Sequence, residues 1–245
     1  MPAITPDEVR AAAARLRGQL VASPTIGSTW PWAGAAEVRW KADLVQPGGS
    51  GWFRGFHHWL LRSFGSFPGV SFVGPPPRLL AAALAAQLHR LPFTAFVVQP
   101  LPGPLASAIS AAGGSVDQAG DPEQAAAELQ QRTGTARLPL AEHAVVAAGL
   151  ATAGLELAAA LPADCAVAYA ASDVTAALRA GLAAAGRTLE VIGVDRAAST
   201  AAIRDQLVVA VALQHRLQLG AEGAAVLAAA AAHRGGGPVG ALVME

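Results

Sequence analysis

The chain has 245 residues, enough for one large domain or two small ones with a substantial core. Its 17 basic and 17 acidic residues cancel, which excludes a global charge field that would recruit nucleic acid or an anionic membrane. Charged residues such as Glu156, Asp164 and Arg179 interrupt its alanine-rich runs, so no run reaches the ~20 apolar residues of a membrane-spanning helix. The N-terminus carries acidic residues where an export signal would be basic and apolar. We therefore expect a cytoplasmic protein that binds neither nucleic acid nor membrane.

Two residue types are rare enough to limit the possible chemistry. Lys41 is the only lysine, because all other basic residues are arginine. Cys165 is the only cysteine, which rules out an internal disulfide and suits a reducing compartment. It stands in an apolar run without a neighbouring His or Arg, so we expect a buried small residue and not a nucleophile.

The predicted elements begin with a helix and a strand. Thr5-Pro6-Asp7-Glu8 has the pattern of a capping box with proline at the first helical position, and predicts a helix to about Leu20. Residues 37 to 42 alternate as a strand does, and the glycine-rich stretch QPGGSGWFRGF, residues 46 to 56, follows. Further strands are predicted at 70–73, 94–98, 166–169, 189–194 and 241–244. Helices are predicted at 78–90, 104–112, 122–132, 144–160 and 174–185. This alternation predicts a mainly parallel α/β sheet, in which ligands bind outside the carboxyl ends of the strands.

Several segments, in order along the chain, resemble the pyridoxal-phosphate (PLP) enzymes of fold type II, the threonine dehydratase and serine racemase group of the tryptophan synthase β superfamily. They are VRWKADLVQPGGSGWFRG (38–55), AGLATAGLE (148–156), VIGVD (191–195) and AEGAA (221–225). The resemblance implies two subdomains: a larger one from residues 1–50 and 140–245, and a smaller one from 51–139. It also implies a shortened C-terminal region, since little chain lies between Arg196 and Glu222.

The resemblance places Trp52 where the family has the lysine that forms the Schiff base with the cofactor. Flanking residues Ser50 and Arg54 match the family pattern. Indole has no basic nitrogen and forms no imine. Lys41 has its own counterpart on the preceding strand, so we do not expect it to replace the missing lysine.

Two further cofactor contacts of the family are altered. Its substrate-carboxylate loop corresponds to Gly74-Pro75-Pro76-Pro77-Arg78, where the prolines remove backbone N–H donors. Arg78 would attract a carboxylate, but a lone arginine at a helix start is expected to be solvated.

The family's phosphate-binding glycines correspond to Ala171-Ser172-Asp173-Val174. Here Asp173 is expected to cap the next helix and to repel phosphate. Ser172 and Thr175 would still donate hydrogen bonds to an anion. The family's final serine- and glycine-containing motif is missing from residues 241–245.

Other constellations favour structural roles. His57-His58 lacks further metal ligands at helical spacing, and solvated or partly buried histidines are expected. His143 and His215 have no nucleophile beside them. Five tryptophans, Trp30, Trp32, Trp40, Trp52 and Trp59, indicate a core or a subunit contact.

The favoured hypothesis is a pseudoenzyme that keeps the scaffold, has lost the cofactor and acts as a binding or partner subunit. Its ligand would be small and amino-acid-like, and it would form a homodimer or a heteromer with a related subunit. The alternative is an active PLP-dependent amino-acid dehydratase or racemase with a non-standard base. A decaying gene product without a selected role is the third possibility.

Overall fold

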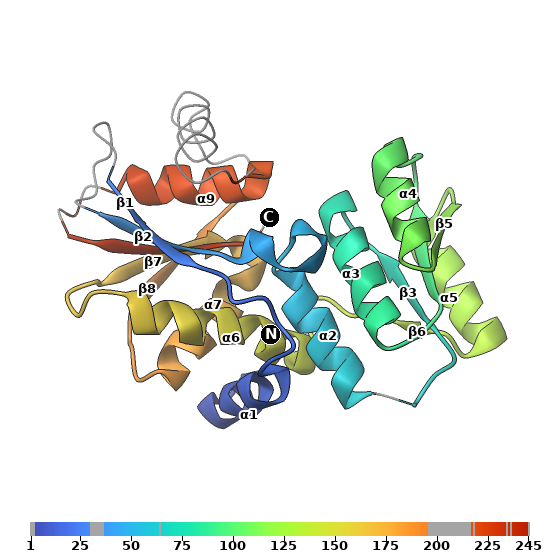
Figure 1. Cartoon of the computed structure of the whole chain (residues 1–245), viewed down its shortest axis with the longest axis horizontal. Coiled ribbons are helices and arrows are strands. Elements are labelled where there is room, and N and C mark those ends of the chain that lie inside the picture. Colours follow the sequence, from blue (N-terminus) through green and yellow to red (C-terminus); the bar gives the residue numbers. More distant parts are fainter. Residues whose placement is uncertain are drawn as a thin grey trace.

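The structure is a computed structural model that describes residues 3–29, 37–63, 65–195, 217, 219–233, 235 and 237–244. It contains two sheets, each with helices on both faces, and the two sheets lie in separate parts of the molecule (Figure 1). The mainly parallel α/β fold predicted from the strand and helix alternation is therefore confirmed.

The five-stranded sheet takes its strands from both ends of the chain. In sheet order these are β1 (Thr25–Ser28), β2 (Val38–Ala42), β9 (Val239–Val243), β7 (Val167–Ala171) and β8 (Glu190–Val194). Among the described strand pairs of this sheet, β1–β2 is antiparallel and the others are parallel. The carboxyl ends of β2, β9 and β7 therefore meet at one edge, which is where ligands bind in sheets of this kind.

The four-stranded sheet comes from the middle of the chain. Its order is β5 (Gly114–Gln118), β4 (Phe93–Val97), β3 (Val70–Val73) and β6 (Ala136–Arg137). All its pairs are parallel.

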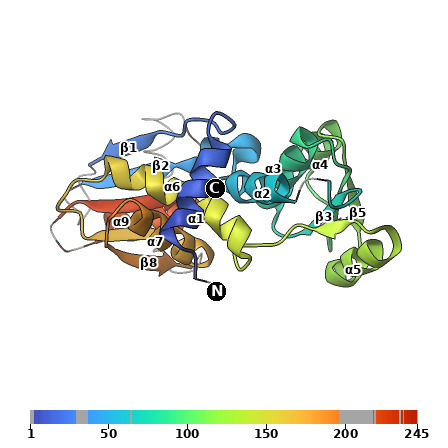
Figure 2. The same ribbon diagram turned by 90° about the horizontal axis from the view of Figure 1, so that it is seen from below.

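Eight α-helices are described: α1 (Pro6–Leu16), α2 (Trp52–Arg62), α3 (Pro76–Leu88), α4 (Gly103–Ala111), α5 (Pro122–Thr133), α6 (Ala144–Ala160), α7 (Thr175–Ala184) and α9 (Ala221–Ala231). Helix α9 covers one face of the larger sheet, and α6 and α7 cover the other (Figure 1). Helices α3 and α4 lie on one face of the smaller sheet and α5 on the other (Figure 2). Helix α2 contacts both α6 and α3, and so joins the two parts.

The capping box at the first helix is confirmed. Thr5 Oγ1 accepts from the Glu8 N–H, and the Glu8 carboxylate accepts from the Thr5 N–H at 2.8 Å. The helix ends at Leu16, one turn before the expected Leu20, because Gly18 adopts a left-handed conformation (φ 75°).

Strands β5 and β6, together with one helix and one further strand, were not predicted from the sequence. Residues 52 to 62 form α2, where the glycine-rich pattern suggested a loop, and residues 25 to 28 form β1. Glycine lowers helix propensity locally, but α2 is almost wholly buried and its packing outweighs that cost.

Close helix packing explains the glycines in the AGLATAGLE segment. A Cβ at Gly149 would lie 2.7 Å from Arg54 O on α2, and one at Gly154 would lie 2.8 Å from Leu178 O on α7. Only glycine lets α6 approach both neighbours this closely.

Candidate functional site

Trp52 begins α2 at the carboxyl edge of the larger sheet. Gly48 and Gly49 turn the chain with positive φ, and Gly51 N–H donates to Met244 O at 2.8 Å, just beyond the end of β9. Ser50, itself fully buried, accepts the Trp52 N–H with its Oγ at 3.3 Å. The Trp52 indole has no exposed surface, and its Nε1–H has no hydrogen-bond partner among the described residues.

Arg78, in the first turn of α3, lies over the indole. The centre of its guanidinium is 4.0 Å from the Trp52 ring centroid, a cation–π geometry. The same group pairs with Asp173 at 2.8 Å and Glu222 at 3.4 Å. Residues from four separate elements, Trp52, Arg78, Asp173 and Glu222, thus meet in one place, called here the Trp52 cluster.

The expectation that Arg78 is solvated is wrong. It is only 8% exposed, because two carboxylates and an aromatic face compensate the loss of its hydration. The sequence could not reveal this, since Asp173 and Glu222 lie about a hundred residues or more away along the chain.

The start of α3 offers few donors to an anion. Pro76 and Pro77 occupy its first positions, Pro75 is its N-cap, and none of the three has an N–H. The Arg78 N–H is already donated to Pro75 O at 3.0 Å.

Asp173 does not cap the following helix, contrary to expectation. It lies in a short 3₁₀ turn, η3 (Ser172–Val174), and α7 has no side-chain cap. The attraction of Arg78 directs its carboxylate across the site instead. Thr175 donates its hydroxyl to Ser172 O at 3.0 Å, and Ser172 is exposed.

A second polar group lies behind α2 and centres on Arg54. This guanidinium has no exposed surface and donates to both oxygens of Asp43 (2.7 and 2.8 Å) and both oxygens of Glu156 (2.7 and 3.0 Å). Ser23, Lys41, Asp43, Arg54, Thr152 and Glu156 form what we call the Arg54 cluster.

The ion pairs of the Arg54 cluster shift the pKa values of Arg54 and Glu156. Burial opposes the charge of Arg54, but the carboxylates of Asp43 and Glu156 outweigh it and raise the guanidinium pKa. Burial also opposes the charge of Glu156, but hydrogen bonds from Arg54 and Lys41 lower its pKa. Arg54 and Glu156 therefore both stay charged within the cluster.

Lys41 belongs to this cluster and not to the Trp52 cluster. Its Nζ lies 2.7 Å from Glu156 Oε2 and donates to Ser23 O at 2.5 Å, and the residue is 2% exposed. A lysine held as a paired ammonium has no free lone pair with which to attack a carbonyl.

The histidine pair on α2 has structural contacts. His57 Nδ1 lies 3.0 Å from His89 Nε2, and His57 Nε2 lies 3.0 Å from Gln19 Oε1. His58 Nδ1 lies 2.8 Å from Val145 O. Both are buried, deeper than the partly buried state expected. Burial, reinforced by His89 and His58, lowers the pKa of His57 to about 4. Among the described residues, no group of three or more His, Cys, Asp or Glu side chains is placed to hold a metal ion.

The tryptophans and the single cysteine differ in how deeply they are buried. Trp40 and Trp52 lie in the core, while Trp59 stacks on Phe67 with centroids 5.2 Å apart. Cys165 is buried, and burial raises the pKa of its thiol, as expected for an unreactive residue. Trp30, Trp32, His215 and the rest of residues 196–216 lie outside the described residues.

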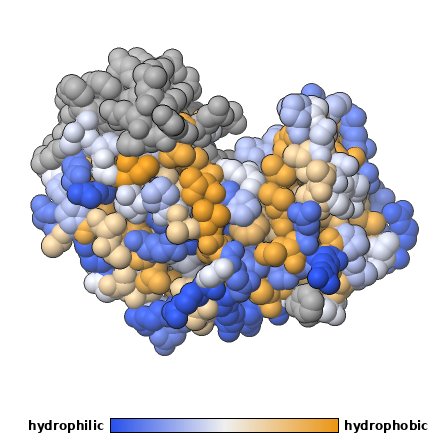
Figure 3. Space-filling view, in the orientation of Figure 1, coloured by the Kyte–Doolittle hydropathy of each residue, from blue (hydrophilic) through white to orange (hydrophobic). Residues whose placement is uncertain are grey.

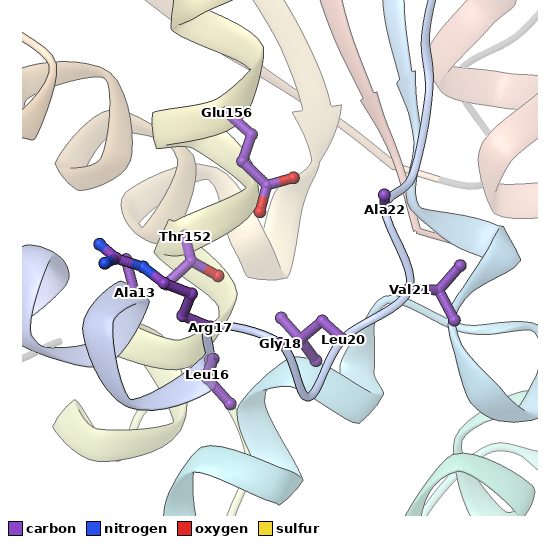
Figure 4. Close-up of a pocket in the computed structure, with 9 residues that line it drawn as sticks. All are labelled: Ala13, Leu16, Arg17, Gly18, Leu20, Val21, Ala22, Thr152 and Glu156. Carbon is purple, nitrogen blue, oxygen red and sulfur yellow. The ribbon is translucent and has the colours of Figure 1, made fainter.

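The structure also contains cavities away from the Trp52 cluster. One of about 310 Å³ lies beside the Arg54 cluster, between the segment 16–22 and α6, where Thr152 and Glu156 face it (Figure 4). Another, of about 340 Å³, is mostly apolar and lies at the carboxyl ends of β3 and β4. The surface is also hollowed between the two sheet-bearing parts (Figure 3). No helix in the described part of the chain is both long and apolar enough to cross a membrane.

Comparisons with known proteins give a clear result only at the level of structure. Neither a protein-family model nor a curated protein sequence matches the chain. A PLP-dependent aspartate racemase is similar over 100% of this chain and 96% of its own, at 17% identity and a TM-score of 0.85. The serine racemase of Dictyostelium discoideum is similar over 99% of this chain and 98% of its own, at 15% identity and a TM-score of 0.88. The processed threonine deaminase isoform 2 of Solanum lycopersicum is similar over 97% of this chain and 84% of its own, at 16% identity and a TM-score of 0.76. The order of strands, the two sheets and these likenesses together establish that the chain has the fold of the fold type II PLP-dependent enzymes.

Proposed function

We propose that this protein is a catalytically inactive relative of the fold type II PLP enzymes, which does not bind PLP covalently and acts as a binding or partner subunit. The observation that carries the proposal is the Trp52 cluster. An indole, a guanidinium and two carboxylates occupy the carboxyl edge of the larger sheet, and the charged groups pair with one another.

The residues at this edge do not fit PLP. The cofactor requires a lysine amine for its imine and donors for its phosphate. The single lysine, Lys41, is buried in the Arg54 cluster. The turn after β7 presents the Asp173 carboxylate where the family resemblance places the phosphate, and like charges repel. The prolines before Arg78 supply no N–H.

The contrast between the two clusters supports the same proposal. Lys41, Arg54 and Glu156 match the family pattern and form a closed ion-pair network that stabilises the scaffold. The positions that depart from the pattern, Trp52 and Asp173, meet in the Trp52 cluster. A chain that keeps the residues that hold the fold and changes those that face the cofactor is what we expect after loss of the reaction.

As a binding subunit, the protein would take a small amino-acid-like ligand, and it would assemble as a homodimer or with a related subunit. Its two sheets suit the division into a larger subdomain (1–50 and 140–245) and a smaller one (51–139), with the ligand between them. The alternative, an active amino-acid dehydratase or racemase with a non-standard base, needs PLP to be held without an imine to the protein.

The experiment that tests the proposal is borohydride reduction in the presence of PLP, followed by peptide mass spectrometry. The inactive subunit gives no cofactor adduct, no aldimine absorbance and no ketoacid from serine or threonine. An adduct on Lys41 would overturn the proposal. Ketoacid release or racemisation without an adduct would support the active alternative.

The partner role is tested by measuring molecular mass with light scattering, for the protein alone and mixed with an active fold type II racemase or dehydratase from the same source. A stable dimer or a mixed complex supports a subunit role. A monomer that changes neither the mass nor the activity of the relative contradicts it.

A further inference from the structure

A small cavity of about 130 Å³ lies between α1, α2 and the first turn of α6. Its polar lining consists of Glu8 and Arg15 from α1 and His58 and Arg62 from α2. Ala144, Val145 and Ala148 form its wall on α6. This cavity is separate from both clusters described above.

His58 is the buried polar group of this cavity. The residue is 2% exposed, and its Nδ1 lies 2.8 Å from the carbonyl oxygen of Val145. Because a carbonyl only accepts, Nδ1 carries the proton and Nε2 of the neutral ring is an acceptor. Nε2 is buried and has no hydrogen-bond partner among the described residues. A buried acceptor of this kind costs free energy until a donor reaches it.

The charges around the cavity favour an anion. Arg15 and Arg62 are exposed, and neither has an ion pair within the described ranges. Glu8 is the acidic group of this lining. Hydrogen bonds from Thr5 N and Thr5 Oγ1 at 2.8 Å, together with the charge of Arg62, lower its pKa, so it stays charged and offsets one of the two arginines. The N-terminus of the 17-residue α6 adds the positive end of its dipole.

We propose that this cavity binds inorganic phosphate, which still carries a proton near neutral pH. Its oxygens accept from Arg15 and Arg62 at the start of α6, and its P–O–H donates to Nε2 of His58. The volume of about 130 Å³ suits one tetrahedral oxyanion. The site is independent of whether the Trp52 cluster excludes the cofactor.

The proton distinguishes phosphate from sulfate at this site. Burial lowers the pKa of His58, the Val145 carbonyl opposes that shift, and the charges of Arg15 and Arg62 add to it. Neutral His58 therefore has no proton to give to sulfate, which has none of its own near neutral pH. The charged and titratable groups around His58 are Glu8 and Arg15 on α1 and His57 and Arg62 on α2, while the α6 wall has none. Sulfate binding should strengthen as pH falls and His58 becomes protonated.

The test is calorimetric titration of the full chain at pH 7.5 with inorganic phosphate, sulfate and glycerol phosphate. Phosphate is expected to bind at least ~10-fold more tightly than sulfate, the effect of leaving one buried polar group unpaired. His58→Asn keeps an amide donor for Val145 O and removes Nε2, and it should weaken phosphate binding by a similar factor. Arg15→Gln and Arg62→Gln should each weaken it by ~10-fold or more, as expected for charge-assisted bonds. Arg17→Gln is the matched control, because Arg17 ends the same helix but does not line this cavity.

Glycerol phosphate, whose second pKa is about 6, has mostly lost its last proton at pH 7.5 and is expected to bind as weakly as sulfate. Binding as tight as that of inorganic phosphate would contradict the hydrogen bond from the P–O–H to Nε2 of His58. Absence of phosphate binding to the folded wild-type protein overturns the proposal, as does an affinity unchanged by the double substitution of Arg15 and Arg62. If His58→Asn does not fold, ¹⁵N NMR of the wild-type imidazoles decides the matter. Phosphate must then shift the His58 Nε2 signal toward that of a hydrogen-bonded acceptor, and an unmoved signal counts against the site.

Discussion

Arg54 keeps its charge without any exposed surface because Asp43 and Glu156 surround it with four oxygens. Removing one member of such a buried network leaves the others uncompensated, which costs more than the pair itself contributes. An exposed ion pair has no such cost, because water solvates whichever partner remains.

Arg54→Met should therefore lower the free energy of unfolding by about 3 to 5 kcal/mol, measured by urea denaturation at pH 7. The control is Arg137→Met, which breaks the exposed pair with Glu123 and should cost less than about 1 kcal/mol. Equal losses in the two variants would show that the Arg54 cluster is not the buried network described.

Trp52→Lys should not restore turnover of serine or threonine with added PLP. The new ammonium would lie next to Arg78 in a fully buried place, and Asp173 and the prolines before Arg78 would remain. Absorbance and ketoacid assays check the chemistry, and urea denaturation should show a loss of about 3 kcal/mol or more. Trp52→Phe, which keeps an aromatic ring under Arg78, should be less destabilised. Recovery of turnover by the single lysine would contradict the proposed loss of function.

At the scale of elements, helix approach depends on glycines that face backbone atoms. Helices α6 and α7 contact through Gly154 and Gly181, where a Cβ at Gly181 would overlap Ala151 O. Backbone atoms cannot turn away as a flexible side chain can, so an added methyl group forces the helices apart.

Gly181→Ala is expected to destabilise the protein by about 1 to 3 kcal/mol or more, in spite of the higher helix propensity of alanine. Thermal and urea unfolding measure the loss. Gly103→Ala is the control, because a Cβ there meets no atom within 4 Å and its backbone is not left-handed. It should be neutral or stabilising by up to about 1 kcal/mol. Similar effects at both positions would contradict the packing argument.

At the scale of the whole molecule, the contact of α2 with α3 joins the two sheet-bearing parts and contains a neutral histidine pair. His57 and His89 lie 3.0 Å apart, so they share one hydrogen bond and cannot both be protonated without repulsion. Burial lowers the pKa of both, that of His57 to about 4. The unfolded chain, with ordinary histidines, then binds more protons than the folded one at mildly acidic pH.

The contribution of neutral His57 to stability is therefore complete above pH ~6.5 and is lost as pH falls toward about 4. The free energy of unfolding should fall by about 2 kcal/mol over this window, allowing for solvent screening. His57→Gln should reduce this dependence, measured by urea denaturation from pH 7.5 to 4.5. His143 lies outside this contact, as the exposed N-cap of α6. A wild-type profile that is flat across the window would contradict the prediction.

Local patterns were sufficient for much of the fold. The capping box of Thr5 and Glu8, the strand at 70–73 and the helix at 144–160 each depend on neighbours in the chain, and the structure has them at or near the expected bounds. Helix α2 was missed because its stability comes from burial between α3 and α6, which its glycine-containing sequence does not display.

The candidate site divides in the same way. The sequence by itself determined the scarcity of amines, with one lysine in the chain, and the donors missing at Pro75 to Pro77, because these follow from residue chemistry alone. Only the tertiary structure decided that Arg78 is buried on Trp52 and paired with Asp173 and Glu222. It also decided that His58, whose Nε2 is buried without a partner among the described residues, lines one cavity with two arginines. The physical reason is that a charge is solvated or paired according to what surrounds it in space, and residues far apart in the chain become neighbours only when the sheets and helices pack.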